Sequence, residues 1–209
     1  MQRYADILTT ALDAGLRVTS VSGEVLAAMA DAQTPQGLLA VCRLPAVDLD
    51  EVLAAEPRVV AVLAHVRDPG NAGTVIRAAD AAGADAVVVS EGSVDAYAPK
   101  VVRSTAGSLF HLPVVTGAPV RAVVDRLRTA GLRILAADGT GDRTVDRVDL
   151  TVRHAWLFGN EAWGFRPGDL ESADDVVRVP IHGRAESLNL AMAATICLYA
   201  SAAAAAPAP

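Results

Sequence analysis

The sequence has little of several residue types, and each shortage excludes a class of protein. Only two of its 209 residues are cysteine, which is too few for a fold held together by disulfide bonds. Lysine occurs only once, at Lys100, and the formal net charge is −6. A protein that coats nucleic acid without regard to sequence is basic, so this composition argues against that class while it leaves room for a local RNA contact.

Long apolar runs and the common catalytic fingerprints are also missing. No apolar stretch is long and clean enough to cross a bilayer and no signal peptide is recognised, so we expect a cytoplasmic protein without a membrane partner. The four histidines and two cysteines lack the spacing of metal ligands, so no metal is expected. There is no Walker loop and no Gly-x-Ser-x-Gly elbow, and residues 70–73 approach a dinucleotide fingerprint without its third glycine.

Apolar residues make up 52% of the chain, and from residue 58 onward they recur in a regular alternation. Short, continuously apolar runs are typical of buried parallel strands, and the segments between them have helical spacing. The pattern predicts an α/β fold whose parallel sheet is covered by helices. We expect strands at 59–66, 86–90, 109–115, 132–137, 154–158 and 176–180. We expect helices at 71–82, 99–105, 119–129 and 187–203.

The first 57 residues follow a less regular pattern. Helical spacing over residues 3–14 is followed by a predicted strand at 16–21, a short helix capped by Ser22, and a second strand at 37–42. Residues 43–57 mix acidic residues, alanines and prolines. We therefore predict a linker there that contains one helical turn.

Three turns, each after an apolar strand, carry the residues that point to chemistry. Ligands of open α/β sheets bind at the carboxyl ends of strands, where these turns are expected. We therefore predict one composite site for a nucleoside-sized ligand. The turns are Asn71-x-Gly73-x-x-x-Arg77, Gly159-x-Glu161-x-x-Gly164, and Pro180-Ile181-x-Gly183 followed by Ser187-Leu188-Asn189-Leu190.

Taken singly, each turn also has a plain structural interpretation. Asn71 suits the cap of a helix and Arg77 a solvated helix face. Glu161 could accept hydrogen bonds from loop N–H groups. Ser187 suits the N-cap of the last helix, which would place Asn189 inside the first helical turn. Only the three turns together favour a binding site.

In their order and spacing, the three motifs resemble those of the SpoU/TrmH family of RNA 2′-O-ribose methyltransferases, which belongs to the SPOUT class. The resemblance covers about residues 58–205 and includes the segment from Lys100 to Phe110. It implies S-adenosylmethionine as the cofactor and a homodimer with the active site at or near the subunit interface. It also implies that the C-terminal part of the sheet forms a trefoil knot, a rare topology.

The resemblance further implies a role for each site residue. The catalytic residues would be Arg77, Asn71, Glu161, Ser187 and Asn189. The cofactor contacts would be Gly159, Val179, Ile181, Gly183 and Leu188, many of them through the backbone. RNA would contact Arg103, Ser104 and Arg77. Because an arginine is a poor general base, we expect Arg77 to hold a phosphate and to stabilise the developing alkoxide.

The resemblance also divides the chain. Residues 1–45 resemble the second half of an L30e-like RNA-binding domain, 46–57 form the linker, 58–205 the methyltransferase domain, and 206–209 a disordered tail. We expect methylation of RNA, with ribosomal RNA favoured over transfer RNA by the N-terminal resemblance. The alternatives are a non-catalytic RNA-binding or assembly protein on the same knotted fold, and a nicotinamide-dependent oxidoreductase on a doubly wound sheet.

Overall fold

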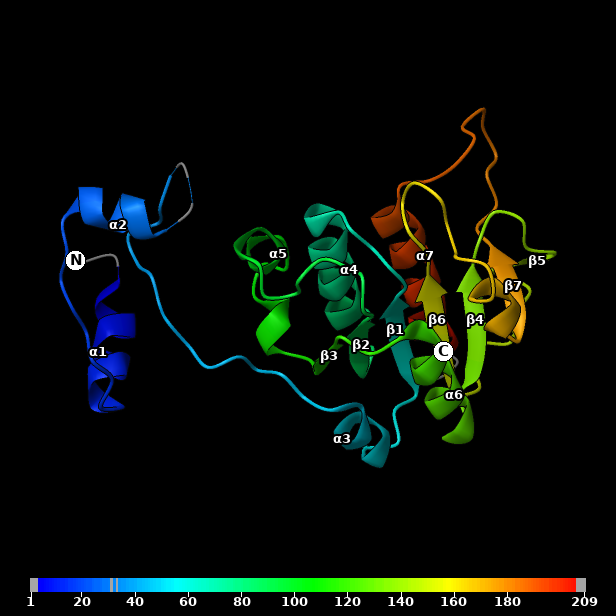
Figure 1. The fold of residues 1–209 in the computed structure, drawn as a ribbon, viewed down its shortest axis with the longest axis horizontal. Coiled ribbons are helices and arrows are strands. Elements are labelled where there is room, and N and C mark those ends of the chain that lie inside the picture. The colour runs from blue at the N-terminus through cyan, green and yellow to red at the C-terminus, as the bar shows by residue number, and fades with distance from the viewer. Residues whose placement is uncertain (1–3, 31, 33, 206–209) are drawn as a thin grey trace. The chain divides into compact units, whose positions relative to one another are not determined.

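The computed structural model describes residues 4–30, 32 and 34–205, and the chain separates into two units, Met1–Arg43 and Leu44–Pro209 (Figure 1). The tail predicted at 206–209 lies outside the described residues. Among the residues that are described, no helix has the length and apolar character that a membrane crossing requires.

Within its described residues, the first unit contains two short helices. Helix α1 (Ala5–Asp13) lies within the helix predicted at 3–14, and α2 (Gly23–Met29) follows Ser22 as predicted. The Ser22 Oγ accepts a hydrogen bond from the Val25 N–H at 3.3 Å, which confirms the predicted cap. Neither helix contains a buried residue.

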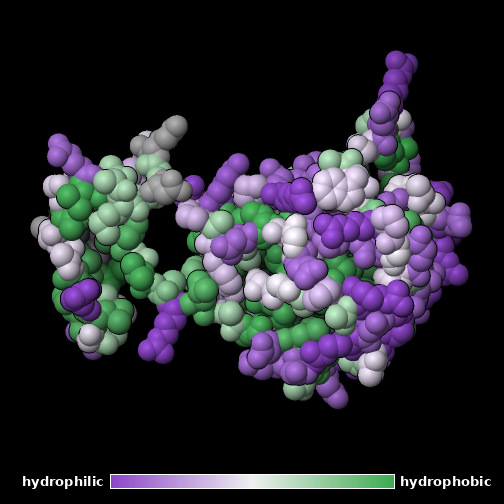
Figure 2. All heavy atoms as spheres, viewed as in Figure 1, coloured by the Kyte–Doolittle hydropathy of each residue, from purple (hydrophilic) through white to green (hydrophobic). Residues whose placement is uncertain are grey.

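The two strands predicted for this unit, at 16–21 and 37–42, are wrong. Both segments are irregular and exposed. A strand is stable only beside paired neighbours, and the described residues of this unit contain no strand to pair with. Most large apolar side chains of this unit, including those of the two predicted strands, are exposed, and Figure 2 shows hydrophobic atoms over this unit. They include Ile7, Leu12, Leu16, Val18, Val21, Val25, Met29, Leu38, Leu39 and Val41.

The second unit is built on a seven-stranded sheet in the order β3-β2-β1-β6-β4-β7-β5, and all of its pairings are parallel. The strands are β1 (Val59–Leu63), β2 (Ala86–Val89), β3 (Val114–Thr116), β4 (Arg133–Ala137), β5 (Arg143–Thr144), β6 (His154–Phe158) and β7 (Asp175–Arg178). The parallel sheet covered by helices confirms the predicted α/β class (Figure 1). Strand β5 was not predicted, because two residues are too few for a periodic signal.

Helices cover both faces of the sheet. They are α3 (Leu49–Ala54), α4 (Pro69–Ala81), α5 (Pro99–Ser104), α6 (Val120–Thr129) and α7 (Leu190–Ala205). Side chains alternate along a strand, so Leu63 packs with the α4, α5 and α7 layer while Val62 packs with the α3 and α6 layer. Every residue of β1 and β6 is therefore buried, which explains why their sequences are apolar apart from His154.

The segment predicted as a linker, 46–57, belongs to the second unit and packs against its sheet layer. Leu49 and Val52 of α3 are buried against the α6 side of the sheet, and Asp50 pairs with Arg126. The single helical turn predicted there is a short helix whose apolar side is covered.

The third predicted strand is shorter than expected. Instead of spanning 109–115, β3 covers only Val114–Thr116, after a 3₁₀ turn at Ser108–Phe110. Leu109 is buried in the core without pairing to a strand, which accounts for its apolar character. Pro113, which has no N–H to donate to a ladder, separates the two elements.

Candidate active site at the carboxyl ends of β1 and β6

The loops that follow β1 and β6 meet at one edge of the sheet. The two strands are neighbours, and Leu63 lies in register with Phe158, so their carboxyl ends adjoin. The loop after β1 leads into α4, which carries the first motif, and the loop after β6 carries the second. This edge is where ligands of parallel α/β sheets bind.

The Glu161 carboxylate joins the second motif to the first. Its Oε1 accepts hydrogen bonds from the Asp68 N–H and from Asn71 Nδ2, both at 3.2 Å, and its Oε2 accepts one from the Arg67 N–H at 3.4 Å. Helix α4 is capped by Asp68, whose Oδ1 accepts from the Asn71 N–H at 2.7 Å. The plain interpretation of Asn71 as a cap is therefore wrong, and its side chain is free to bind Glu161.

Asn189 joins the third motif to the other two. Its Nδ2 donates to Asn71 Oδ1 at 3.0 Å, and its Oδ1 accepts from the N–H groups of Ala191 at 2.9 Å and Met192 at 3.3 Å. These contacts make Asn189 the N-cap of α7. The prediction that Ser187 caps this helix, with Asn189 inside its first turn, is wrong. A hydrogen-bonded chain of side chains thus connects all three motifs.

Two motif glycines are explained by close packing. A Cβ built on Gly73 would lie 2.4 Å from the Ser104 Cβ, so only glycine lets α4 and α5 approach this closely. A Cβ on Gly159 would lie 2.8 Å from the Gly164 backbone. Around Gly183, in contrast, a Cβ would meet nothing within 4 Å. Packing alone therefore accounts for the first two glycines but not for the last.

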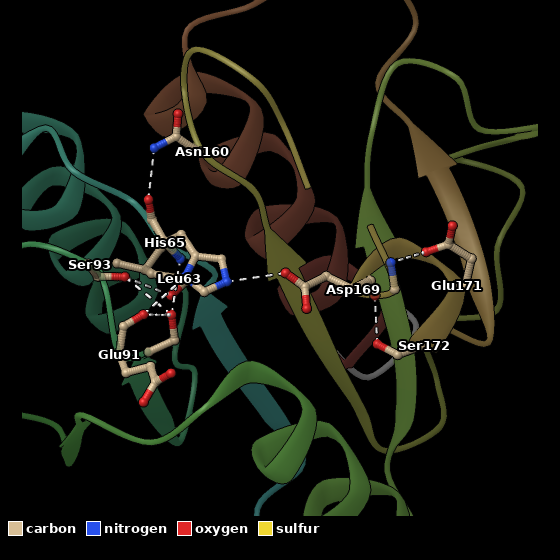
Figure 3. Close-up of polar contacts among 10 residues, drawn as sticks. Leu63, His65, Glu91, Ser93, Asn160, Asp169, Glu171 and Ser172 are labelled. Carbon is tan, nitrogen blue, oxygen red and sulfur yellow. Dashed lines mark hydrogen bonds and ion pairs between the residues drawn. The ribbon is translucent and has the colours of Figure 1, made fainter. Parts of the chain in front are cut away.

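His65, which the motifs do not include, lies in the loop after β1 and contacts residues of three other segments (Figure 3). It is 4% exposed, and its φ of 58° is in the left-handed region. Its Nδ1 lies 3.0 Å from the Glu91 carbonyl oxygen, and its Nε2 lies 3.2 Å from Asp169 Oδ2. Its own carbonyl accepts a hydrogen bond from Asn160 Nδ2 at 2.8 Å. Left-handed backbone costs a residue with a side chain about 1–2 kcal/mol, and these contacts offset that cost.

The predicted RNA contacts do not belong to this hydrogen-bonded chain. Arg77 lies on α4 with an exposed side chain that makes no hydrogen bond or ion pair within the described residues. Arg103 is exposed near the end of α5. The Ser104 Oγ donates to the Lys100 carbonyl at 2.9 Å, and its Cβ packs towards Gly73. The two arginines are therefore open to solvent, while Ser104 is engaged in packing.

The predicted cofactor contacts lie mainly on an exposed segment. Residues 181–189 are all exposed, with Ile181 at 39% and Leu188 at 37% (orange in Figure 1). No backbone hydrogen bond involves residues 180–188 within the described chain. Cavities of about 120 and 300 Å³ lie elsewhere, lined by residues outside the three motifs. The structure thus brings Asn71, Glu161 and Asn189 together and leaves this segment apart from a closed pocket.

Sequence reasoning missed His65, Asn160 and Asp169. Asn160 is 6% exposed and, besides its bond to His65, accepts the Ala162 N–H on its Oδ1 at 2.8 Å. The available signals were a histidine and an asparagine, each placed two residues after the end of a buried strand. Across the described residues, no group of three or more His, Cys, Asp and Glu side chains has the geometry to hold a metal.

Comparisons with known proteins give the family. A model of the SpoU rRNA Methylase family matches residues 58–199. The 23S rRNA (guanosine(2553)-2′-O)-methyltransferase RlmP of Bacillus subtilis is 38% identical over 188 residues, which are 90% of this chain and 73% of the relative.

Solved structures agree. The SpoU methyltransferase AviRb from Streptomyces viridochromogenes, in complex with AdoMet, has a TM-score of 0.68 and 37% identity, covering 76% of this chain and 65% of that one. An AdoMet-bound rRNA methyltransferase from Sinorhizobium meliloti has a TM-score of 0.80 and 29% identity, covering 96% of this chain and 77% of that one. This chain therefore spans about two thirds to three quarters of the length of these relatives. It belongs to the SpoU rRNA methylase family.

Proposed function

We propose that this chain methylates the 2′-hydroxyl of a ribose in 23S ribosomal RNA, with its site at the carboxyl ends of β1 and β6. The activity class follows from the family: the chain is an S-adenosylmethionine-dependent RNA 2′-O-ribose methyltransferase. The observation that carries the proposed site is the hydrogen-bonded chain from Glu161 through Asn71 to Asn189. It holds three separate motifs in one place.

The exposed segment of the third motif fits the cofactor. It offers the apolar side chains of Ile181 and Leu188 together with backbone N–H and C=O groups that make no backbone hydrogen bond within the described residues, a chemistry that suits an adenosyl group. The proposed contacts are Gly159, Val179, Ile181, Gly183 and Leu188. When bound, S-adenosylmethionine supplies an electrophilic methyl group.

The chain's own residues would position the ribose and accommodate charge. The 2′-hydroxyl develops negative charge as its proton leaves, and the exposed Arg77 guanidinium has no competing partner in the described chain. Asn71 and Asn189 are held in fixed orientations by Glu161 and by the start of α7, so they would orient the reacting groups. Ser187, two residues before the cap, would contribute a hydroxyl from the exposed segment.

The RNA is proposed to extend along α5 from this site. Arg103 is an exposed cation there, and Ser104 marks where α5 approaches α4. An arginine suits bidentate contact with a phosphate. We propose that residues 1–45 are an L30e-like RNA-binding region and residues 58–205 the catalytic domain. The proposed place of action is the cytoplasm.

The proposed homodimer is supported by an uncovered face of α7. Its buried side packs on the sheet, yet Met192, Ile196 and Tyr199 on the other side are 54%, 41% and 51% exposed. A helix that is apolar all round is normally buried, so a second copy of the chain is the proposed cover. Ile196→Asp should convert a dimer to a monomer in analytical ultracentrifugation. A wild-type chain that sediments as a monomer would contradict the dimer.

The trefoil knot also remains a proposal. The strand order supports the proposal, since the chain crosses the sheet more than once near its C-terminus. Strand β7 lies beyond β4, and α7 then returns to contact β4, β6 and α4. A crystal structure tests this, because the path of the chain can then be traced from end to end. A path that would straighten when its two ends are pulled contains no knot and would contradict the proposal.

The test is transfer of a labelled methyl group from S-adenosylmethionine to transcripts of 23S rRNA and, separately, of transfer RNA. We expect label in the 23S transcript at one nucleotide that resists alkaline cleavage, the signature of a 2′-O-methyl group. Arg77→Ala is the inactive control. RNA binding without transfer would favour the non-catalytic alternative. Binding of NAD in place of S-adenosylmethionine would favour the oxidoreductase, against which the family membership argues.

A further inference from the structure

The chain has two tryptophans, and they occupy opposite environments. Trp156 lies in β6 and is completely buried, whereas Trp163 lies in the second motif and is 46% exposed. Only 4% of the residues are aromatic. Single exposed apolar residues are common, so exposure alone carries no conclusion. What sets Trp163 apart is how it is held and what lies beside it.

The turn that bears Trp163 is held in a fixed shape. Asn160 and Gly164 exchange hydrogen bonds between their backbones, at 2.7 and 2.9 Å. The Asn160 side chain accepts the Ala162 N–H and donates to the His65 carbonyl, so it ties the turn to the loop after β1. A fixed turn presents the indole in one place at little cost in conformational entropy.

The guanidinium of Arg67 lies over the indole of Trp163, with its Cζ 5.0 Å from the ring centroid. The Arg67 N–H also binds Glu161 at 3.4 Å, so the pair adjoins the hydrogen-bonded chain of the candidate site. Arg67 is itself exposed. The pair therefore combines a flat aromatic surface, a flat cation and direct attachment to the residues proposed to orient the ribose.

Flat aromatic rings and guanidinium planes are the surfaces on which unpaired RNA bases stack. An apolar protein partner would need a wider apolar surface than one indole with a cation on it, so the chemistry favours a nucleobase. The arginine also adds attraction for the neighbouring phosphates, in a chain whose net charge of −6 gives no general attraction.

We propose that Trp163 and Arg67 form a stacking platform for an unpaired base of the RNA substrate, next to the nucleotide that is methylated. The proposal rests on the proposed function, because it takes RNA as the substrate. It adds a specific RNA contact within the second motif, whose family role lies with Glu161 and the glycines.

The two tryptophans allow a direct optical test on the full chain. A base stacked on Trp163 quenches its fluorescence, while the buried Trp156 serves as an internal reference. Titration with a 23S rRNA transcript should quench part of the emission of the wild-type protein. The Trp163→Phe variant keeps only Trp156 and should show no quenching, although it still binds RNA.

Affinities give the second readout. Trp163→Ala should raise the Kd for the transcript by about 5- to 150-fold, the loss expected when one base can no longer stack. Arg67→Lys, which keeps the charge but not the flat surface, should have a smaller effect. The Kd for S-adenosylmethionine should change less than about twofold in each variant. Arg121→Ala, an exposed arginine of α6, is the matched control and should leave the RNA Kd unchanged.

Each outcome decides the proposal. Unchanged RNA affinity in Trp163→Ala, or equal quenching in wild type and Trp163→Phe, overturns it. A change of oligomeric state in Trp163→Ala overturns it as well, because the indole would then belong to a subunit contact. Quenching without methyl transfer leaves the platform and removes the proposed function. Methyl transfer without quenching supports the proposed function and overturns the platform.

Discussion

Two regions of the candidate site differ in how far a single chain completes them. Asn71 is bonded to Glu161 at 3.2 Å and to Asn189 at 3.0 Å, and Asn189 also caps α7. Residues 180–188 make no backbone hydrogen bond in the described chain, and the side chains of 181–188 are exposed. The first region is already organised, and the second has free polar groups and uncovered apolar side chains.

The difference separates two tasks that the motifs perform. A group that must orient a reacting ribose benefits from fixed neighbours, because geometry set before binding lowers the barrier. A segment that must enclose a cofactor needs to admit it first. We infer that binding of the cofactor orders residues 180–188, while the hydrogen-bonded chain changes little.

The largest expected effect comes from Arg77, which belongs to neither region. Arg77→Ala should lower methyl transfer by about 100- to 1000-fold, the usual loss when a group that stabilises developing charge is removed. Because the side chain is exposed and unpaired in the described chain, thermal stability and the Kd for S-adenosylmethionine should stay at their wild-type values. Calorimetry and a transfer assay check both, and equal losses of binding and transfer would assign Arg77 a structural role.

Asn189 tests the organised region itself. Asn189→Asp keeps a good N-cap for α7 but places a carboxylate opposite Asn71. Asn71 would then lie between two carboxylates, that of Glu161 and that of the new aspartate. Its amide can donate to only one of them, so its oxygen faces the other. We expect transfer to fall about 10- to 100-fold, a loss of about 1.4–2.7 kcal/mol in transition-state stabilisation, with nearly unchanged stability.

Asn189→Ala is the companion variant. It loses the same contact and also the cap, so unfolding should cost about 1 kcal/mol less than in wild type. If the aspartate variant were fully active in transfer, the bond between Asn71 and Asn189 would have no part in catalysis.

His65 tests whether the support beneath the organised region matters. His65→Gly and His65→Ala both remove the ring contacts to Glu91 and Asp169, but only glycine relieves the left-handed backbone. We expect the glycine variant to be more stable than the alanine variant by about 1 kcal/mol in chemical unfolding. Both should lose about fivefold in transfer, the factor that corresponds to ~1 kcal/mol. Full activity in both variants would show that the imidazole serves stability alone.

The smallest effect concerns pH and the core beneath the site. His154 begins β6 fully buried, and this burial lowers the pKa of its imidazole below the ordinary value. The unfolded chain then binds this proton more readily, so stability falls as the pH drops through about 6.5 and towards the lowered pKa of the folded state. The slope due to one histidine is at most about 1.4 kcal/mol per pH unit. His154→Gln should flatten the pH dependence of unfolding in that window, and an unchanged slope would contradict this origin.

The sequence predicted the sheet well because burial leaves a strong mark on it. Strands β1 and β6 are buried on both sides, so every residue is apolar apart from His154. The same signal failed at residues 16–21 and 37–42, where apolar residues have no neighbouring strand to pair with. An apolar run indicates side chains that favour burial, but it forms a strand only when a neighbouring strand is present to pair with it.

The site was harder to predict, since its geometry depends on contacts between distant residues. The motifs indicated Asn71, Glu161 and Asn189, but not which atoms meet. The bond from His65 to Asp169 joins residues 104 positions apart, and no local spacing reveals it. The predicted cap of α7 was Ser187, whereas the structure has Asn189. The Asn189 side chain accepts a hydrogen bond from the start of the helix and donates one to Asn71.

Hydrogen–deuterium exchange with and without S-adenosylmethionine most directly tests the contrast between the two regions. Amides of residues 181–188 should exchange rapidly in the free protein and become protected when the cofactor is added, whereas amides at the start of α4 and α7 should be protected in both states. Unchanged rapid exchange of 181–188 at saturating cofactor would contradict the account.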